Sequence, residues 1–125
     1  MSNKINVVAA VICVKEKYLV CQRPKHKRHG GLWEFPGGKV DLNETFENAI
    51  KRELFEELSI NLINIGKVLY STGETNSDYV IHFIESHILG KPKLNEHQKK
   101  RWATKEELLQ LPFAPSDMKF IQQLR

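Results

Sequence analysis

The segment from Phe46 to Leu58 carries the strongest structural signal in the sequence. It contains no glycine, proline or valine, and Thr45 before it is a favourable helix N-cap residue. Ile50, Leu54 and Leu58 recur at intervals of four, which places them on one face of a helix. We therefore expect an amphipathic helix of about three and a half turns over residues 46–58.

Three glutamates share one side of this expected helix, next to its apolar stripe. At about 100° per residue, Glu56 and Glu57 lie about 60° and about 40° to either side of Glu53. Like charges and partial burial both raise the pKa of such carboxyl groups, so a positive partner is required. Hard divalent cations meet that requirement, and Mg²⁺ held by carboxylates and substrate phosphates is common in phosphoryl chemistry. Arg52 is expected to pair with Glu44 or Glu56, and surface ion pairs alone would explain the same cluster.

Runs rich in β-branched and aromatic residues predict strands on both sides of the helix. We expect a hairpin from residues 5–14 and 18–22, a short aromatic strand at 32–35, two strands at 60–72 and 78–89, and another at 101–103. Pro36-Gly37-Gly38 is a turn signal after the aromatic strand. A capping box at residues 104–107 opens a short helix, and a last helix is expected to begin near Ser116. This order of elements favours an α+β or α/β sandwich.

The length and composition suit one compact domain. The chain has 125 residues, of which 41% are hydrophobic and 27% charged, and no repeat or linker divides it. A chain of this size buries about two thirds of the surface that its unfolded form exposes, which is enough for a hydrophobic core. We therefore expect a single domain over residues 1–125, and we exclude a multidomain or disordered protein.

The cysteines and the N-terminal residues indicate the compartment. Cys13 and Cys21 lie in apolar runs without metal-ligand spacing, so we expect two reduced thiols in the core. Residues 1–6 lack a signal-peptide pattern, and the longest apolar run, residues 7–14, is too short to cross a bilayer. These features predict a cytoplasmic protein that does not interact with membranes.

Positive charge is unevenly distributed along the chain. The formal net charge is +4, and the excess is concentrated in residues 23–29 and 99–101. An anionic partner fits this distribution, although a solvated surface rich in lysine and arginine would give the same sequence pattern.

The glutamate-rich helix and the loop before it match a longer pattern. Gly38 is followed after five residues by Glu44, and after seven more by Arg52-Glu53-Leu54-x-Glu56-Glu57-x-Ser59-Ile60. This spacing resembles the Nudix box, G-x5-E-x7-R-E-U-x-E-E-x-G-U, where U is a bulky aliphatic residue. Ser59 stands where the pattern has glycine. A residue with a Cβ is strained by about 1 kcal/mol in the left-handed conformation that closes such a helix. We therefore expect Ser59 to alter the local turn more than the chemistry.

The resemblance to Nudix hydrolases implies a fold and a metal site. The implied fold is an α/β/α sandwich with a mixed β-sheet between helices, and the implied reaction cleaves a nucleoside diphosphate linked to another group. The implied ligands of Mg²⁺, or of Mn²⁺ as a substitute, are Gly37, Gly38, Glu53, Glu56, Glu57 and Glu96. Glu53 is our candidate general base and Glu96 the second candidate. Glu44 and Arg52 would be structural partners rather than ligands.

Segments outside the box resemble the MutT-like branch of the family, and within it the CTP pyrophosphohydrolase-like and 8-oxo-dGTP diphosphatase proteins. These segments are Gln22-Arg23-Pro24, residues 32–39, Glu96-His97-Gln98 and residues 113–117. The branch removes pyrophosphate from nucleoside triphosphates, and Arg23 and Lys39 would then contact the phosphates. An ordinary surface role would account for either cation alone.

Four residues are candidates for contact with the base. Phe35, Tyr79 or Phe83 could stack on it, although aromatic residues in strands are more often part of the core. Asp117 stands where MutT-like proteins that prefer an oxidised guanine offer an asparagine. An ionised carboxylate only accepts hydrogen bonds, which suits the amino group of cytosine and disfavours guanine O6. We therefore expect a preference for cytidine nucleotides, and a simple helix-start role is the alternative for Asp117.

The leading hypothesis is a Mg²⁺-dependent enzyme that converts a nucleoside triphosphate to the monophosphate and pyrophosphate. A second hypothesis changes the substrate to an oxidised purine triphosphate. A third is a noncatalytic nucleotide or nucleic-acid binding module that uses the basic loop at residues 23–28. Such a module would be expected to lose acids that this chain retains, so nucleic acid is not the expected partner. The sequence leaves monomer and homodimer open.

Overall fold

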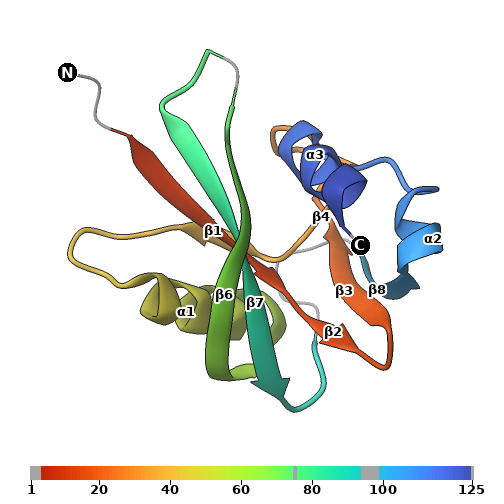
Figure 1. Cartoon of the computed structure of the whole chain (residues 1–125), viewed down its shortest axis with the longest axis horizontal. Coiled ribbons are helices and arrows are strands. Elements are labelled where there is room, and N and C mark those ends of the chain that lie inside the picture. The colour runs from red at the N-terminus through yellow and green to blue at the C-terminus, as the bar shows by residue number, and fades with distance from the viewer. Residues whose placement is uncertain (1–3, 75, 94–98, 125) are drawn as a thin grey trace.

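The computed structural model describes residues 4–74, 76–93 and 99–124, which form two β-sheets and three helices (Figure 1). The elements are β1 (Ile5–Val11), β2 (Cys13–Val14), β3 (Lys17–Gln22), β4 (Trp33–Glu34), β5 (Gly37–Lys39), α1 (Phe46–Leu58), β6 (Asn61–Gly73), β7 (Tyr79–Leu89), β8 (Lys99–Thr104), α2 (Lys105–Leu108) and α3 (Pro115–Gln123). None of the helices in these ranges is long and apolar enough to cross a membrane.

The larger sheet is mixed, with the strand order β5-β1-β7-β6. Strand β1 runs parallel to β7, whereas the β1–β5 and β6–β7 pairs are antiparallel. The smaller sheet has the order β2-β3-β4, and β8 also pairs with β3. Its strand pairs are all antiparallel.

Residues of β1 alternate between two hydrophobic cores, as side chains on a strand do. Val8 and Ala10 belong to one cluster together with Leu54 of α1. Ala9 belongs to a second cluster together with Phe120 of α3. Figure 1 shows α1 and α3 on either side of β1. The larger sheet therefore lies between two helices, and the expected α/β/α sandwich with a mixed sheet is confirmed.

Helix α1 has the bounds that the sequence predicted. The Thr45 hydroxyl accepts a hydrogen bond from the backbone N–H of Asn48 at 3.1 Å, so the N-cap is also confirmed. Ser59 closes the helix in the left-handed region with φ of 55°, and its N–H donates to carbonyl groups of the last turn. Serine here adopts the conformation for which glycine is usual, at a cost of about 1 kcal/mol.

The first expected strand is divided between the two sheets. Strand β1 pairs with β5 and β7, and only Cys13 and Val14 pair with β3. Ile12 lies between β1 and β2, is buried, and accepts a hydrogen bond from the N–H of Leu19 at 3.0 Å. The prediction of one continuous hairpin strand over residues 5–14 is wrong because the chain passes from one sheet to the other at Ile12.

Gly37 and Gly38 form strand β5 with Lys39 instead of the predicted turn. The strand pairs with β1, where Gly37 lies opposite Ala9. A Cβ on Gly37 would collide with the carbonyl oxygen of Val8. Close approach of a neighbouring strand, rather than a turn, is what requires glycine here.

The two cysteines differ in exposure. Cys21 is buried in the core, as expected, whereas Cys13 is exposed. Cys13 belongs to the two-residue strand β2, in which both residues are exposed. The prediction of a core thiol at Cys13 is therefore wrong.

The C-terminal elements follow the sequence prediction with small shifts of their ends. Strand β8 begins two residues before the expected strand at 101–103. The capping box is present, because Thr104 and Glu107 each accept a hydrogen bond from the other's backbone N–H. Helix α3 begins at Pro115, one residue before Ser116.

Candidate active site

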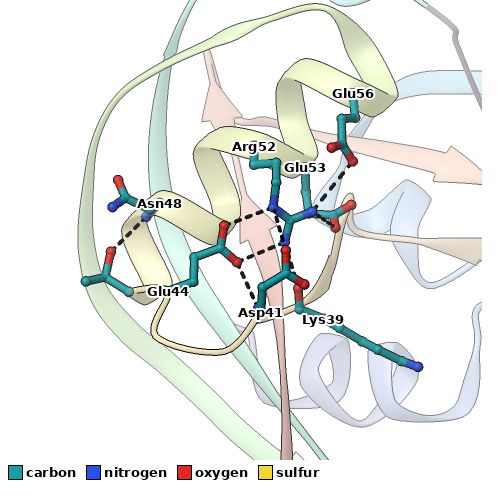
Figure 2. Close-up of polar contacts among 8 residues, drawn as sticks. Lys39, Asp41, Glu44, Asn48, Arg52, Glu53 and Glu56 are labelled. Carbon is teal, nitrogen blue, oxygen red and sulfur yellow. Dashed lines mark hydrogen bonds and ion pairs between the residues drawn. The ribbon is translucent and has the colours of Figure 1, made fainter.

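Arg52 joins helix α1 to the loop before it (Figure 2). Its Nε and one terminal nitrogen donate to the two carboxylate oxygens of Glu44, each at 2.9 Å. The same terminal nitrogen donates to the backbone carbonyl of Lys39 at 2.9 Å. The Arg52 guanidinium lowers the pKa of Glu44 to about 2, and Glu44 raises the pKa of Arg52. The pairing that the sequence suggested is thus present, and it fixes β5 relative to α1.

Arg52 also contacts two of the three clustered glutamates. Its other terminal nitrogen lies 2.6 Å from a carboxylate oxygen of Glu53 and 3.6 Å from one of Glu56. The Glu53 side chain is mostly buried, whereas the Glu56 side chain is 49% exposed. Arg52 therefore supplies part of the positive charge that the cluster of acids requires.

The two glycines of β5 allow its backbone to approach the acids of α1. The N–H of Gly37 donates to the buried Glu57 carboxylate at 3.2 Å. A Cβ on Gly38 would lie only 2.5 Å from the carboxyl carbon of Glu53. A side chain at Gly38 would thus displace the Glu53 carboxylate from its place against the strand.

A cavity of about 310 Å³ lies between β5, α1 and the loop after β3. We call it the acidic cavity, and its lining residues are Arg23, Pro24, Lys27, Glu34, Gly37, Gly38, Lys39, Glu53 and Glu57. It brings together both predicted phosphate ligands, Arg23 and Lys39, with two of the predicted acids. The cations predicted to bind phosphate and two of the carboxylates predicted to bind metal therefore line one cavity.

Of the predicted metal ligands that the structure describes, Glu56 alone does not line the acidic cavity. Its position on α1 turns the carboxylate outward toward Arg52 (Figure 2). Glu96 lies outside the described residues. Over the residues that the structure describes, no three His, Cys, Asp or Glu side chains are gathered so that they could hold a metal ion.

The donors that remain still fit a divalent cation. Glu53, Glu57 and the backbone of Gly37 and Gly38 offer hard oxygen atoms at one cavity. Mg²⁺ is commonly bound by one or two carboxylates, with substrate phosphates and water completing its coordination. A metal site shared between this chain and a phosphate group is consistent with that donor set.

A second cavity, of about 260 Å³, lies on the α3 side of the larger sheet. We call it the aromatic cavity, and its lining residues include Phe35, Tyr79, Ile81, Ala114 and Asp117. Of the four predicted base contacts, Phe83 does not line it. Phe83 is fully buried and stacks on Phe120 at 4.6 Å between ring centroids, so it is part of the core.

The two aromatic side chains that do line this cavity have other contacts as well. Phe35 is 2% exposed and lies against the rings of Phe113 and Phe120, so little of its ring is open. The Lys39 ammonium lies 5.1 Å from the centroid of the Tyr79 ring. Tyr79 therefore contacts a cation of the acidic cavity in addition to lining the aromatic one.

Asp117 is buried at the wall of the aromatic cavity. One of its carboxyl oxygens accepts a hydrogen bond from the N–H of Phe35 at 2.9 Å. Burial raises the pKa of Asp117 to about 8, so the group is largely protonated at neutral pH. The expectation of an ionised, acceptor-only carboxylate is therefore wrong, because a protonated carboxyl both donates and accepts.

Sequence reasoning missed several residues of the aromatic cavity. Glu34, Arg28, His29 and Glu74 also line it, and Arg28 lies 3.9 Å from the Glu74 carboxylate. Arg28 and Glu74 come from two loops distant in sequence, which no local pattern brings together. Glu34 had a local signal, since it is a charged residue between Trp33 and Phe35 and ends a short strand.

Comparison with known proteins identifies a family model and several relatives that match this chain. A family model described as NUDIX domain matches residues 3–124. The chain is 40% identical over 121 residues to the CTP pyrophosphohydrolase of Escherichia coli (strain K12), covering 94% of this chain and 89% of that protein. It is 34% identical over 130 residues to the 8-oxo-dGTP diphosphatase of Haemophilus influenzae, covering 99% of this chain and 94% of that protein.

Solved structures agree with the sequence relatives. The solution structure of the E. coli ORF135 protein has a TM-score of 0.82 and 38% identity, covering 96% of this chain and 87% of that one. The crystal structure of the MutT NUDIX hydrolase from Burkholderia pseudomallei has a TM-score of 0.85 and 26% identity, covering 98% of this chain and 99% of that one.

Proposed function

Because the chain belongs to the Nudix family of hydrolases, we propose that it is a Mg²⁺-dependent nucleoside triphosphate pyrophosphohydrolase that favours cytidine nucleotides. The proposed reaction adds water across a phosphoanhydride bond and yields a nucleoside monophosphate and pyrophosphate. The observation that carries the proposal is that the acidic and aromatic cavities share the wall formed by Gly37 and Gly38. A nucleotide can then place its base in one cavity and its phosphates in the other.

The acidic cavity offers what a triphosphate needs. Arg23 and Lys39 supply fixed positive charge to phosphate oxygens. Glu53 and Glu57, with carbonyl oxygens of Gly37 or Gly38, would hold the divalent cation, for which Mn²⁺ is a substitute. When bound, the cation supplies charge that stabilises the oxygens of the phosphate group under attack.

Hydrolysis also needs a group that takes a proton from the attacking water. We propose Glu53, whose carboxylate lies against Gly38 and is held by Arg52 at 2.6 Å. The proton passes from water to this carboxylate as the new P–O bond forms and the anhydride bond breaks. Glu96 is the second candidate for the same role.

The proposed preference for cytidine rests on the similarity to a CTP pyrophosphohydrolase, and Asp117 is compatible with it. A protonated Asp117 can donate a hydrogen bond to N3 of cytosine, which accepts one. A protonated Asp117 can also donate a hydrogen bond to O6 of an oxidised guanine. An 8-oxo-dGTP diphosphatase is therefore the second candidate function.

The test is hydrolysis of CTP, dCTP, 5-methyl-dCTP and 8-oxo-dGTP by the purified protein, with Mg²⁺ and without it. Pyrophosphate release that requires Mg²⁺, with the highest kcat/KM for a cytidine nucleotide, supports the proposal. A higher kcat/KM for 8-oxo-dGTP supports the second candidate. No pyrophosphate from any of the four overturns both.

A further inference from the structure

Arg23 is held in place by two hydrogen bonds from its guanidinium group. One terminal nitrogen donates to the Glu34 carboxylate at 2.7 Å. Its Nε donates to the backbone carbonyl of Arg28, also at 2.7 Å. Glu34 belongs to β4, where it lies opposite Cys21 of β3, so it is anchored on the smaller sheet. The Arg23 guanidinium is thus oriented by a strand on one side and by its own loop on the other.

The Arg23–Glu34 pair lies where the two cavities meet. Both residues line the acidic cavity and the aromatic cavity, as do Gly37 and Gly38. In a nucleotide that spans the two cavities, the group at this wall is the phosphate that carries the nucleoside. Arg23 is therefore placed to contact that phosphate rather than the pyrophosphate end.

The charge of Glu34 is unfavourable for attracting phosphate. Its side chain is only 16% exposed, and it puts a negative charge beside a space that must take a triphosphate. An unpaired arginine would attract an anion more strongly. The contribution that Glu34 can make is orientation, since an arginine side chain otherwise has many rotamers.

We infer that Glu34 is a positioning residue for substrate binding, which holds the Arg23 guanidinium at the wall between the two cavities so that it contacts the phosphate next to the nucleoside. The inference rests on the proposed function. Through the bond from Arg23 to the Arg28 carbonyl, the same pair orders the loop that carries Arg28 and His29 to the aromatic cavity. Glu34 thereby acts on the nucleotide through Arg23.

The test is a double-mutant cycle of Glu34→Ala and Arg23→Ala, with CTP as substrate. Glu34→Ala is expected to raise KM about tenfold and to change kcat by less than about threefold, because it affects binding more than the chemical step. The double variant should have the KM of Arg23→Ala alone. Glu34→Gln should recover part of the loss, because an amide oxygen still accepts a hydrogen bond from the guanidinium.

Glu107→Gln is the matched control. Glu107 pairs with Arg101 at 2.6 Å, and neither residue lines the acidic or the aromatic cavity. The KM for CTP of this variant should equal that of the wild type.

Three results would overturn the inference. If Glu34 contacts the base directly, Glu34→Ala still raises KM when Arg23 is alanine, and the increase differs between CTP and 8-oxo-dGTP. Simple electrostatics predicts that Glu34→Gln lowers KM below that of the wild type. A purely structural role predicts a lower Tm and a lower kcat with KM unchanged.

Calorimetric titration of metal-free wild type and variants with CTP separates this inference from the proposed function. If the wild type binds CTP but releases no pyrophosphate with Mg²⁺, the proposed function fails. The Kd values for CTP then still test the inference. It holds if the effects of Glu34→Ala and Arg23→Ala on the binding free energy are non-additive, and it fails if these effects add.

Discussion

The backbone N–H of Phe35 donates a hydrogen bond to the carboxyl group of Asp117, 2.9 Å away and 82 residues later in the chain. This bond joins the segment between β4 and β5 to the first turn of α3 at the wall of the aromatic cavity. Burial, and to a smaller extent the charge of Glu34, raise the pKa of Asp117 to about 8. A neutral carboxyl group in this position has a consequence for stability.

We expect Asp117→Asn to remove a pH dependence of stability. The folded protein keeps a proton on Asp117 that the unfolded chain releases above about pH 4, so its free energy of unfolding falls from about pH 4 to about pH 8. Asparagine is neutral throughout and still accepts the hydrogen bond from Phe35. Urea unfolding should show the variant to be more stable than the wild type by roughly a few kcal/mol at about pH 8, and by much less at about pH 5. Equal pH slopes for the two proteins would show that Asp117 is ionised when folded.

We expect the Glu44–Arg52 pair to contribute to stability in the opposite pH range. The pKa of Glu44 is lowered to about 2, so the stabilisation is present above about pH 4.3 and is lost as the pH falls from there toward 2. Glu44→Gln should flatten the acid limb of a plot of Tm against pH and lower Tm at neutral pH. An acid limb as steep as that of the wild type would contradict the role given to this pair.

The two adjacent glycines of β5 should respond differently to alanine. In Gly38→Ala the new Cβ meets the end of the flexible Glu53 side chain, which can move. The expected result is a kcat at least about tenfold lower with Tm nearly unchanged. In Gly37→Ala the new Cβ meets the backbone carbonyl of Val8, which cannot move without breaking the β1–β5 pair. Tm should therefore fall clearly, and equal effects of the two substitutions would be evidence against these contacts.

The two thiols should react at very different rates with a thiol reagent. Cys13 is exposed, whereas Cys21 is buried and its pKa is raised, chiefly by burial. One thiol should react quickly in the folded protein and the second only in urea, because the thiolate is the reactive form. Cys13→Ser should abolish the fast phase. Two fast thiols in the native protein would contradict the core position of Cys21.

Helix α1 could be predicted from the sequence because its signals are local. The Thr45 cap, the apolar spacing and the helix-closing position of Ser59 all lie within one segment, and the structure has each of them. The positions of Glu53 and Glu57 at one cavity follow from this helix once β5 is packed against it.

The features that could not be predicted depend on distant neighbours. Gly37 and Gly38 have the local pattern of a turn, and only the approach of Val8 and Glu53 shows why they are glycines in a strand. The pKa of Asp117 depends on burial between α3 and the segment at Phe35, which sequence spacing does not show.

The most direct test of the central claim is pyrophosphate release from CTP by the wild type and by Glu53→Gln, with Mg²⁺ and with EDTA. Glu47→Gln is the matched control, because Glu47 is an exposed residue in the first turn of α1 and lines neither of the two cavities. We predict release by the wild type and by Glu47→Gln with Mg²⁺, none with EDTA, and a loss of at least about a hundredfold in Glu53→Gln with Tm preserved. Full activity of a folded Glu53→Gln protein, or release that does not depend on the metal, would contradict the account.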